Sequence, residues 1–348
     1  MSPGKRAGSA NPLPFRHPDR TLISFGFDVE ALVTGATGFV GSHLVQLLVE
    51  AGVGVRALVR RTSDTRNLQT LGIRRVETSL EDEAGLARAA EGANVVYHLA
   101  ALTRARSRNE YFRVNAEAVR IIAQVARSAG ARLVYLSSLA AVGPTREGRP
   151  VVESDPPLPI TEYGRSKLAG EVACRESGAE TVILRAPAVY GPGDRELLRF
   201  FAMAARGLIL MPTGPDRPLQ LLHVRDLSTA LAQAGAVSGP GALYHVADPR
   251  VYAWSAAIEL VAAAVGRRVR VLRVPSALVI TAAAASEWGA GVLGRATMFN
   301  RDKVRELLAP GWLCDTAAAE RELGFRCRIP LATGLTETAQ WYRARGWL

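Results

Sequence analysis

The sequence predicts an α/β fold: a doubly wound parallel sheet, with a smaller and mostly helical lobe formed by the C-terminal part. Short runs of β-branched residues alternate with helical stretches in the first half of the chain, which is typical of parallel strands joined by crossover helices. The first run leads directly into a glycine-rich turn that opens a helix. Beyond Pro192 the alternation ends, and most of the later sequence has a helical pattern.

Each expected element follows from its own residue pattern. Strands are expected in short β-branched runs, namely residues 31–34, 55–59, 74–77, 95–99, 133–136 and 181–184. Helices are expected between them, as at 41–51 and 116–128. A Gly/Pro-rich segment at 212–218 precedes a further strand around 220–224, and a helix at 335–347 lies at the end of the sequence.

Composition excludes several classes of protein. The 348 residues carry a formal net charge of +11, mostly from arginine spread along the chain. There is no run of Lys and Arg interleaved with aromatic residues, so no nucleic-acid binding is expected; an anionic cofactor or an anionic membrane surface explains the charge more simply. Cys174, Cys314 and Cys327 lack the spacing of a metal or redox site, so we predict no metal and reduced thiols in a cytoplasmic protein.

The glycine-rich turn has the context of a dinucleotide-binding loop, because it follows a strand and opens a helix. Its residues are Gly35, Thr37, Gly38, Phe39, Val40 and Gly41. Glycine lets the chain turn tightly and approach a pyrophosphate, whose charge then meets free N–H groups at the helix N-terminus. The segment therefore predicts a Rossmann-type nucleotide site; an ordinary tight turn is the alternative.

The end of the second predicted strand bears on the choice of cofactor. An acidic residue there would bind the ribose 2′-hydroxyl of NAD, whereas arginine accommodates the 2′-phosphate of NADP. Here the strand ends in Arg60 and Arg61, and the next carboxylate is Asp64. We predict NADP, with Arg60 as the first choice of phosphate ligand and Arg61 as the second. NAD is the alternative cofactor, and the alternative for the two arginines is a solvated loop.

Tyr163 and Lys167 stand four residues apart on a predicted helix, so their side chains share a face. A free phenol titrates near pH ~10, and a neighbouring ammonium lowers that pKa. A shift of roughly three units, ~4 kcal/mol, would let the phenol donate or accept a proton near neutrality. Alone, the pair would be a solvated helix face; together with the upstream glycine loop it predicts a catalytic site.

Together these motifs resemble the extended short-chain dehydrogenase/reductase family, which includes nucleotide-sugar epimerases, 3β-hydroxysteroid dehydrogenases and dihydroflavonol reductases. The resemblance covers roughly residue 29 to the C-terminus. The matching segments are 34–41, 98–101, Asn115, 136–138, 163–167, 184–192 and 223–226.

The resemblance assigns roles to individual residues. It implies that Tyr163 is the acid/base, that Lys167 depresses its pKa and binds the nicotinamide ribose, and that Ser138, preferred to Ser137, polarises the reacting oxygen. Asn115 completes the implied catalytic set. His98 and His223 are expected to be structural. Further cofactor contacts are implied at Ser79, Leu80, Leu99, Ala100, Ala101, Pro187 and Val189, and substrate contacts at Thr103, Arg104, Ser138 and Tyr190.

Departures from the family's usual motifs narrow the choice among its branches. Leu139 and Ala140 replace the acidic pair of the dehydratases, so water elimination is not expected. Ala188 and Leu219 replace polar residues usual in the epimerases, although Arg217 lies near enough to substitute for the second. The surroundings of the serine and tyrosine are apolar, which fits a sterol-like or polycyclic substrate; ordinary core packing is the alternative. The residues concerned are Leu102, Leu139, Ala140 and Val142.

The most apolar later stretch, residues 275–293, approaches the length of a membrane span. Ser276, Thr281, Ser286 and Glu287 interrupt it, so we expect no transmembrane helix. We expect a buried or substrate-facing helix; peripheral contact with lipid is the alternative.

The resulting prediction is an NADP(H)-dependent oxidoreductase that interconverts a secondary alcohol and a ketone on a hydrophobic small molecule, as in the 3β-hydroxysteroid dehydrogenase-like branch. A nucleotide-sugar epimerase with bound NAD(P) and a non-catalytic NADP-sensing protein are the alternatives, and the resemblance implies a homodimer. Residues 1–27 would be a disordered leader. Residues 28–185, with a return segment at about 220–248, would bind the cofactor, and 186–219 with 249–348 would bind the substrate.

Overall fold

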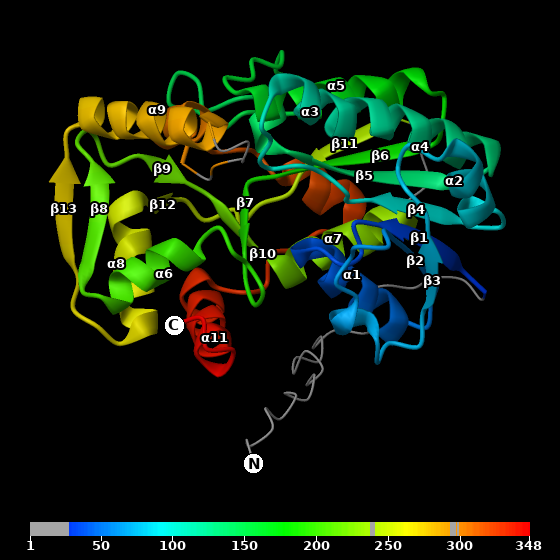
Figure 1. Cartoon of the computed structure of the whole chain (residues 1–348), viewed down its shortest axis with the longest axis horizontal. Coiled ribbons are helices and arrows are strands. Elements are labelled where there is room, and N and C mark those ends of the chain that lie inside the picture. The colour runs from blue at the N-terminus through cyan, green and yellow to red at the C-terminus, as the bar shows by residue number, and fades with distance from the viewer. Residues whose placement is uncertain (1–27, 237–240, 293–296, 298) are drawn as a thin grey trace.

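The computed structural model describes residues 28–236, 241–292, 297 and 299–348 (Figure 1). The predicted leader, residues 1–27, lies outside the described residues. Within them, the predicted doubly wound sheet and the mostly helical C-terminal part are both present (Figure 1).

A seven-stranded parallel sheet forms the centre of the first part of the molecule. Its strands are β1 (Glu30–Thr34), β2 (Gly54–Val59), β3 (Arg74–Glu77), β4 (Val95–His98), β5 (Arg132–Ser138), β6 (Thr181–Ala186) and β11 (Ala242–His245). They lie in the order β11-β6-β5-β4-β1-β2-β3. The order reverses direction between β1 and β4, and the carboxyl ends of open parallel sheets bind ligands at such a point.

Helices cover both faces of this sheet (Figure 1). On one face α1 (Phe39–Glu50) packs against α7 (Val224–Ala236), and their apolar side chains join those of the strands in one buried cluster. On the other face α2 (Glu83–Ala90), α4 (Ala118–Ser128) and α5 (Glu162–Glu176) pack side by side. The two buried clusters explain why the predicted strands are apolar on both faces.

The six predicted sheet strands are confirmed to within two residues at each end. The seventh, β11, was not predicted as a strand, although it lies in the predicted return segment. The strand predicted around 220–224 is β10 (Leu221–His223), which pairs with β7 (Ala188–Tyr190) outside the main sheet.

The helix predicted at 116–128 starts earlier than expected. α3 (Arg108–Phe112) runs through a π-helical turn (Arg113–Glu117) into α4. Ser107 caps the start of α3, where its hydroxyl accepts a hydrogen bond from the Glu110 amide, and the Glu110 carboxylate accepts one from the Arg106 amide. This Ser-x-x-Glu pattern is a helix-start signal that could have been read from the sequence.

The second part of the molecule has its own buried cluster, built mainly from α6, α8, α11 and β8. Its remaining strands are short, and β8 pairs with β13 while β9 pairs with β12. The elements are α6 (Leu198–Ala205), β8 (Leu208–Pro212), β9 (Pro218–Leu219), β12 (Tyr252–Ala253), α8 (Trp254–Val265), β13 (Arg270–Val274), α9 (Ser276–Val292), α10 (Arg301–Leu308) and α11 (Leu331–Ala344). The predicted boundaries of the two domains stay a prediction.

Residues 275–293 were expected to form a buried or substrate-facing helix; the expectation of burial is wrong, and a substrate-facing role stays a prediction. They form α9, but Leu278 is 59% exposed and Trp288 is 76% exposed, while Ala283 is buried. An evenly apolar helix has no polar face to show from sequence which side meets solvent. No helix in the described part of the chain is long and apolar enough to cross a membrane.

Candidate active site

The glycine loop lies at the carboxyl end of β1, where its shape depends on missing side chains. Gly35 has φ +71°, and a Cβ there would lie 2.7 Å from the Ala100 nitrogen. A Cβ on Gly41 would overlap the Gly35 carbonyl oxygen. Gly38 precedes α1 without a side-chain cap. The first N–H groups of α1 are therefore open to an anion, as a dinucleotide pyrophosphate requires.

Residues 99–101, which follow the neighbouring strand β4, lie next to this loop. The Thr34 hydroxyl accepts a hydrogen bond from the Ala100 amide at 3.3 Å, and the Leu99 amide donates to the Thr34 carbonyl. Leu99 and Ala100 are partly exposed and Ala101 is exposed. The end of β4 therefore lies against the glycine loop.

Arg60 and Arg61 are exposed just beyond β2, and within the described residues neither side chain forms an ion pair or a hydrogen bond. Asp64, the nearest following carboxylate, pairs with Arg66, and this hydrogen bond lowers its pKa to about 2. Ser79 and Leu80 follow β3 next to this turn, because the Thr78 amide donates to the Val59 carbonyl. The predicted phosphate and adenine contacts thus share one corner of the sheet.

Pro187 and Val189 follow β6 and are partly exposed. The same segment reaches α1, where the Pro192 carbonyl hydrogen-bonds the His43 ring at 2.8 Å. A Cβ on Gly193 would lie 3.6 Å from the Phe39 ring. The predicted nicotinamide contacts therefore stand on a chain segment that lies against the cofactor helix.

Tyr163 lies in the first turn of α5, close to the end of β5. Gly164 makes this approach possible, because a Cβ there would collide with the Ala140 carbonyl. Ser138 is partly exposed at the end of β5, and its hydroxyl acts on the Tyr163 phenol to lower the pKa of that phenol. Ser137 points the other way and donates to the buried Glu171 carboxylate at 2.6 Å. These contacts favour Ser138 over Ser137 as the partner of Tyr163.

Lys167 is buried one helical turn beyond Tyr163. Its Nζ donates to the Leu136 carbonyl at 2.7 Å and lies 4.2 Å from the centre of the Tyr135 ring. Burial lowers the pKa of Lys167 to about 7, and the carboxylate of Glu171 opposes this shift.

The sequence predicted a lowered pKa for Tyr163, but the protein raises it. Burial raises the pKa of the phenol well above its ordinary value, and the hydrogen bond from Ser138 offsets only part of this. The carboxylates of Glu306 and Glu196 raise it further. The largest influence on the pKa of this phenol is desolvation, not the Lys167 ammonium that the four-residue spacing predicted.

Asn115 is fully buried in the π-helical turn, and its amide binds backbone and hydroxyl groups. Its oxygen accepts from the Leu102 amide at 2.8 Å, and its nitrogen donates to the Leu102 carbonyl at 2.9 Å and to the Ser166 hydroxyl at 3.0 Å. Asn115 therefore ties the chain after β4 to the helix that carries Tyr163 and Lys167.

Several neighbours of Tyr163 were missed by the sequence analysis. The Tyr111 ring lies 6.2 Å from the Tyr163 ring, and its position four residues before Asn115 was a readable signal. Glu196 pairs with Arg104 at 3.2 Å and with Lys303 at 3.6 Å. Lys303 also pairs with Glu306 in the same turn of α10. No local pattern links these distant segments to Tyr163.

Two features of the predicted substrate site need correction. Tyr190 is 2% exposed and packs edge-on against the His223 ring, so it is a core residue rather than a substrate neighbour. Leu139 and Val142 are buried in a small core cluster, which is the core-packing alternative. Thr103 is exposed and its hydroxyl lies 3.4 Å from the Glu196 carboxylate, and Leu102 is partly exposed.

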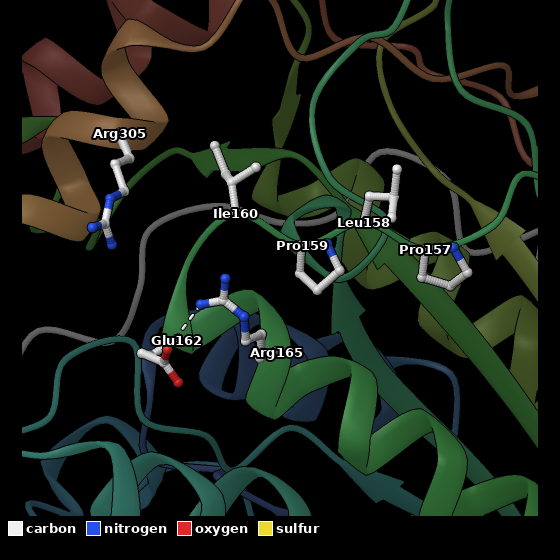
Figure 2. A pocket seen from close by; sticks show the side chains of 7 residues that line it. All are labelled: Pro157, Leu158, Pro159, Ile160, Glu162, Arg165 and Arg305. Carbon is white, nitrogen blue, oxygen red and sulfur yellow. Dashed lines mark hydrogen bonds and ion pairs between the residues drawn. The ribbon is translucent and has the colours of Figure 1, made fainter.

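A hollow of about 250 Å³ opens beside Tyr111. Arg108, Glu162, Glu287 and Asp302 are among its lining residues, so it lies where α3, α5, α9 and α10 meet. A second hollow of about 730 Å³ lies on the outer side of the 157–160 segment (Figure 2). Its Arg165 pairs with Glu162, and it holds none of the predicted catalytic residues (Figure 2).

His98, predicted to be structural, is buried between β1 and β5. Its Nδ1 lies 2.7 Å from the Thr34 hydroxyl, its ring stacks on Tyr135, and burial together with the nearby Lys167 lowers its pKa to about 3.

We expect His98 to make the protein sensitive to acid. The unfolded chain binds this proton below pH ~6.5, whereas the folded protein does not until about pH 3, so stability is lost as the pH falls between these values. The loss is on the order of 5 kcal/mol. Urea unfolding from pH 7 to pH 4 should show a shallower decline in the free energy of unfolding for His98→Gln. Parallel pH curves would contradict this assignment.

Comparison with known proteins matches this geometry. The model of the NAD dependent epimerase/dehydratase family matches residues 31–247. Over 318 residues the chain is 35% identical to the ceramide reductase of Caulobacter vibrioides, covering 91% of this chain and 95% of that protein. It is 27% identical to the 4-hydroxy-2-methyl-3-oxo-4-farnesyl-3,4-dihydroquinoline-1-oxide ketoreductase of Stigmatella aurantiaca, covering 90% and 96%.

Among solved structures, MoeE5 in complex with UDP-glucuronic acid and NAD is 26% identical, with a TM-score of 0.73 over 91% of this chain and 99% of that one. The family match spans the sheet from β1 to β11 and includes the glycine loop. The chain therefore belongs to the NAD dependent epimerase/dehydratase family of oxidoreductases, within the extended short-chain dehydrogenases/reductases.

Proposed function

We propose that this protein is an NADP(H)-dependent oxidoreductase that interconverts a ketone and a secondary alcohol on an amphipathic lipid. The observation that carries the proposal is the interaction of the Ser138 hydroxyl with the Tyr163 phenol, which lowers the pKa of that phenol, in a chain whose glycine loop opens the uncapped start of α1. Bound NADPH would supply the hydride that reduces the ketone carbon.

The chain's own residues would supply the proton that the carbonyl oxygen takes up during reduction. Ser138 would hold the carbonyl oxygen through its hydroxyl, and Tyr163 would donate its phenolic proton to that oxygen as charge develops there. Burial keeps Tyr163 protonated, as a donor must be. Lys167, whose pKa burial lowers to about 7, can be charged or neutral near neutrality, which fits a role in resupplying the phenol. Asn115 would act as a positioning residue, because it contacts Leu102 and Ser166.

The substrate class rests on two observations. Two relatives that cover most of the chain are named as a ceramide reductase and a ketoreductase of a farnesylated quinoline, and both names describe lipid-like molecules. The surroundings of Tyr163 are charged: Glu196 forms ion pairs with Arg104 and Lys303, and Glu306 forms one with Lys303. A hydrophobic molecule with a polar head group fits these charged surroundings better than a wholly apolar molecule does.

Turnover and fluorescence quenching of bound NADPH should be measured with a ceramide bearing a ketone in place of its secondary hydroxyl, with a 3-ketosteroid and with a nucleotide sugar. The proposal predicts turnover with a lipid ketone. Turnover with the nucleotide sugar alone would contradict it.

Cofactor choice yields a separate prediction. Arg60→Ala should weaken NADP by about 30-fold and NAD by less than about threefold, because one charge-assisted hydrogen bond to the 2′-phosphate is worth about 2 kcal/mol. Arg66→Ala is the matched control, since Arg66 lies on the same turn but is paired with Asp64. Fluorescence titration with both cofactors measures the affinities. Equal weakening of the two would show that Arg60 does not bind that phosphate.

A nucleotide-sugar epimerase is the second candidate, and the cations Arg104 and Lys303 near Tyr163 favour it. Both are already neutralised by carboxylates, which weakens their attraction for a diphosphate. An epimerase returns its cofactor to the starting state in every cycle, so it shows no net change in NADPH absorbance at steady state. The predicted homodimer stays a prediction.

A further inference from the structure

Exposed apolar side chains gather on one face of the second part of the molecule. Of the ten large hydrophobic side chains that are exposed among the described residues, seven come from β8, β13 and α9. Five of them, Leu208, Leu210, Leu272, Leu278 and Trp288, make up what we call the apolar face. Val271 is paired with the buried Ile209 and so points to the other side of the strand pair, and Ile280 lies on another side of α9. Monomeric soluble proteins rarely expose such a concentration without a partner.

The three elements are directly connected to one another. β13 pairs with β8 in parallel register, with Leu272 beside Leu210 and Arg270 beside Leu208. Paired residues of a sheet point to the same side, and so do residues two apart on one strand. Leu208, Leu210 and Leu272 therefore share a face. α9 begins directly after β13, and its Ser276 hydroxyl donates to the Thr213 carbonyl at the end of β8. Figure 1 shows α9 extending from the end of this strand pair.

The exposed side of α9 is uncharged. Leu278, Thr281, Ala285 and Trp288 recur at spacings of three and four residues, so they lie on one side of the helix, and all four are exposed. Glu287 belongs to a less exposed side and pairs with Arg301. Such a helix presents only apolar and small side chains to whatever covers it.

Basic side chains stand at the other end of the strand pair. Arg206, Arg267, Arg268 and Arg270 are exposed there, and the Arg270 amide donates to the Gly207 carbonyl, which brings the two arginine segments together. None of these four guanidinium groups forms an ion pair with a carboxylate of the described residues. An apolar face beside unpaired arginines is complementary to a layer with a hydrocarbon interior and an anionic surface.

We propose that the apolar face binds the surface of an anionic phospholipid bilayer, with α9 and the β8–β13 pair against the lipid. The four arginines would contact the lipid phosphates, while Leu278 and Trp288 enter the boundary between head groups and acyl chains. This docking does not depend on the reaction catalysed. In the docked orientation, the hollow beside Tyr111 would lie next to the bilayer, because Glu287 of α9 lines this hollow.

Sedimentation with vesicles tests the proposal on the full chain. The protein should bind vesicles of phosphatidylcholine mixed with phosphatidylglycerol, and bind phosphatidylcholine alone far more weakly. Arg268→Gln with Arg270→Gln should weaken binding about 30-fold, because each basic side chain near an anionic surface contributes about fivefold. Leu278→Ser with Trp288→Ser should weaken it at least about tenfold.

The matched control is Val172→Ser with Val251→Ser, two valines exposed outside the apolar face. This control should bind vesicles within about twofold of the unmodified protein, because neither side chain would meet the lipid. All of these positions are exposed, so circular dichroism should show unchanged folding. Equal losses in the control and apolar-face variants, or no binding to anionic vesicles at all, would overturn the proposal.

Two further measurements separate the bilayer from a protein partner. On adding anionic vesicles, tryptophan emission should shift to the blue, and Trp288→Phe should abolish the shift while keeping binding. A shift that persists in Trp288→Phe would place the contact elsewhere. If Leu278→Ser with Trp288→Ser instead converts a dimer into a monomer in sedimentation velocity, the face is an interface between copies of this chain and the bilayer proposal is wrong.

Discussion

Tyr163→Phe is expected to lower kcat by about a thousandfold while leaving the affinity for NADPH within about threefold. The substitution removes the hydroxyl on which Ser138 acts and keeps the ring that packs near Tyr111. The reacting oxygen would then have no acid to protonate it. Steady-state turnover of a lipid ketone and fluorescence titration with NADPH measure the two quantities.

Tyr111→Phe is the matched control for this prediction. Tyr111 is a neighbouring phenol, but its hydroxyl donates to the Thr103 carbonyl rather than to Ser138. We expect turnover within about tenfold of the unmodified enzyme, since only the position of Thr103 is disturbed. If Tyr111→Phe lost as much activity as Tyr163→Phe, the proton donor would be misassigned.

Glu171→Ala should lower the free energy of unfolding by about 3–5 kcal/mol, the second largest effect that we expect. Glu171 is fully buried and forms an ion pair with the buried Arg185 at 2.7 Å, and it also accepts from Ser137. Removing the carboxylate leaves the Arg185 charge without a partner in the core. Urea unfolding followed by circular dichroism measures the change.

Arg175→Ala controls for the loss of a charge near Glu171. Arg175 pairs with the same carboxylate at 3.2 Å, but its side chain is 42% exposed, so we expect a loss of at most about 1 kcal/mol. Glu171→Leu combined with Arg185→Met should recover much of the stability lost by Glu171→Ala, because no buried charge remains. Equal losses in Arg175→Ala and Glu171→Ala would show that the buried pair has no special weight.

The sequence predicted the sheet well because each strand and the glycine loop are coded locally. The apolar runs, the glycines at 35, 38 and 41, and the four-residue spacing of Tyr163 and Lys167 are short-range patterns. Strand pairing is not local, so the sequence predicted the strand that became β10 without showing that it pairs outside the main sheet, and it did not predict β11, the seventh strand of that sheet.

The surroundings of the site could not be predicted for the same reason. Glu196 and Lys303 lie more than a hundred residues apart in sequence, yet they pair near Tyr163. The pKa of Tyr163 depends on how deeply packing buries the phenol, which spacing does not report. Whether Leu139 lines a cleft or a core, and which side of α9 is exposed, also depend on tertiary packing.

The most direct test of the central claim follows deuterium from NADPH labelled at the C4 position of the nicotinamide. With a ceramide-type ketone as substrate, we predict one deuterium on the carbinol carbon of the product for each NADPH consumed, and almost none with Tyr163→Phe. Product that carries no deuterium, or conversion of a sugar nucleotide without net consumption of NADPH, would contradict the proposal that this chain reduces a lipid ketone.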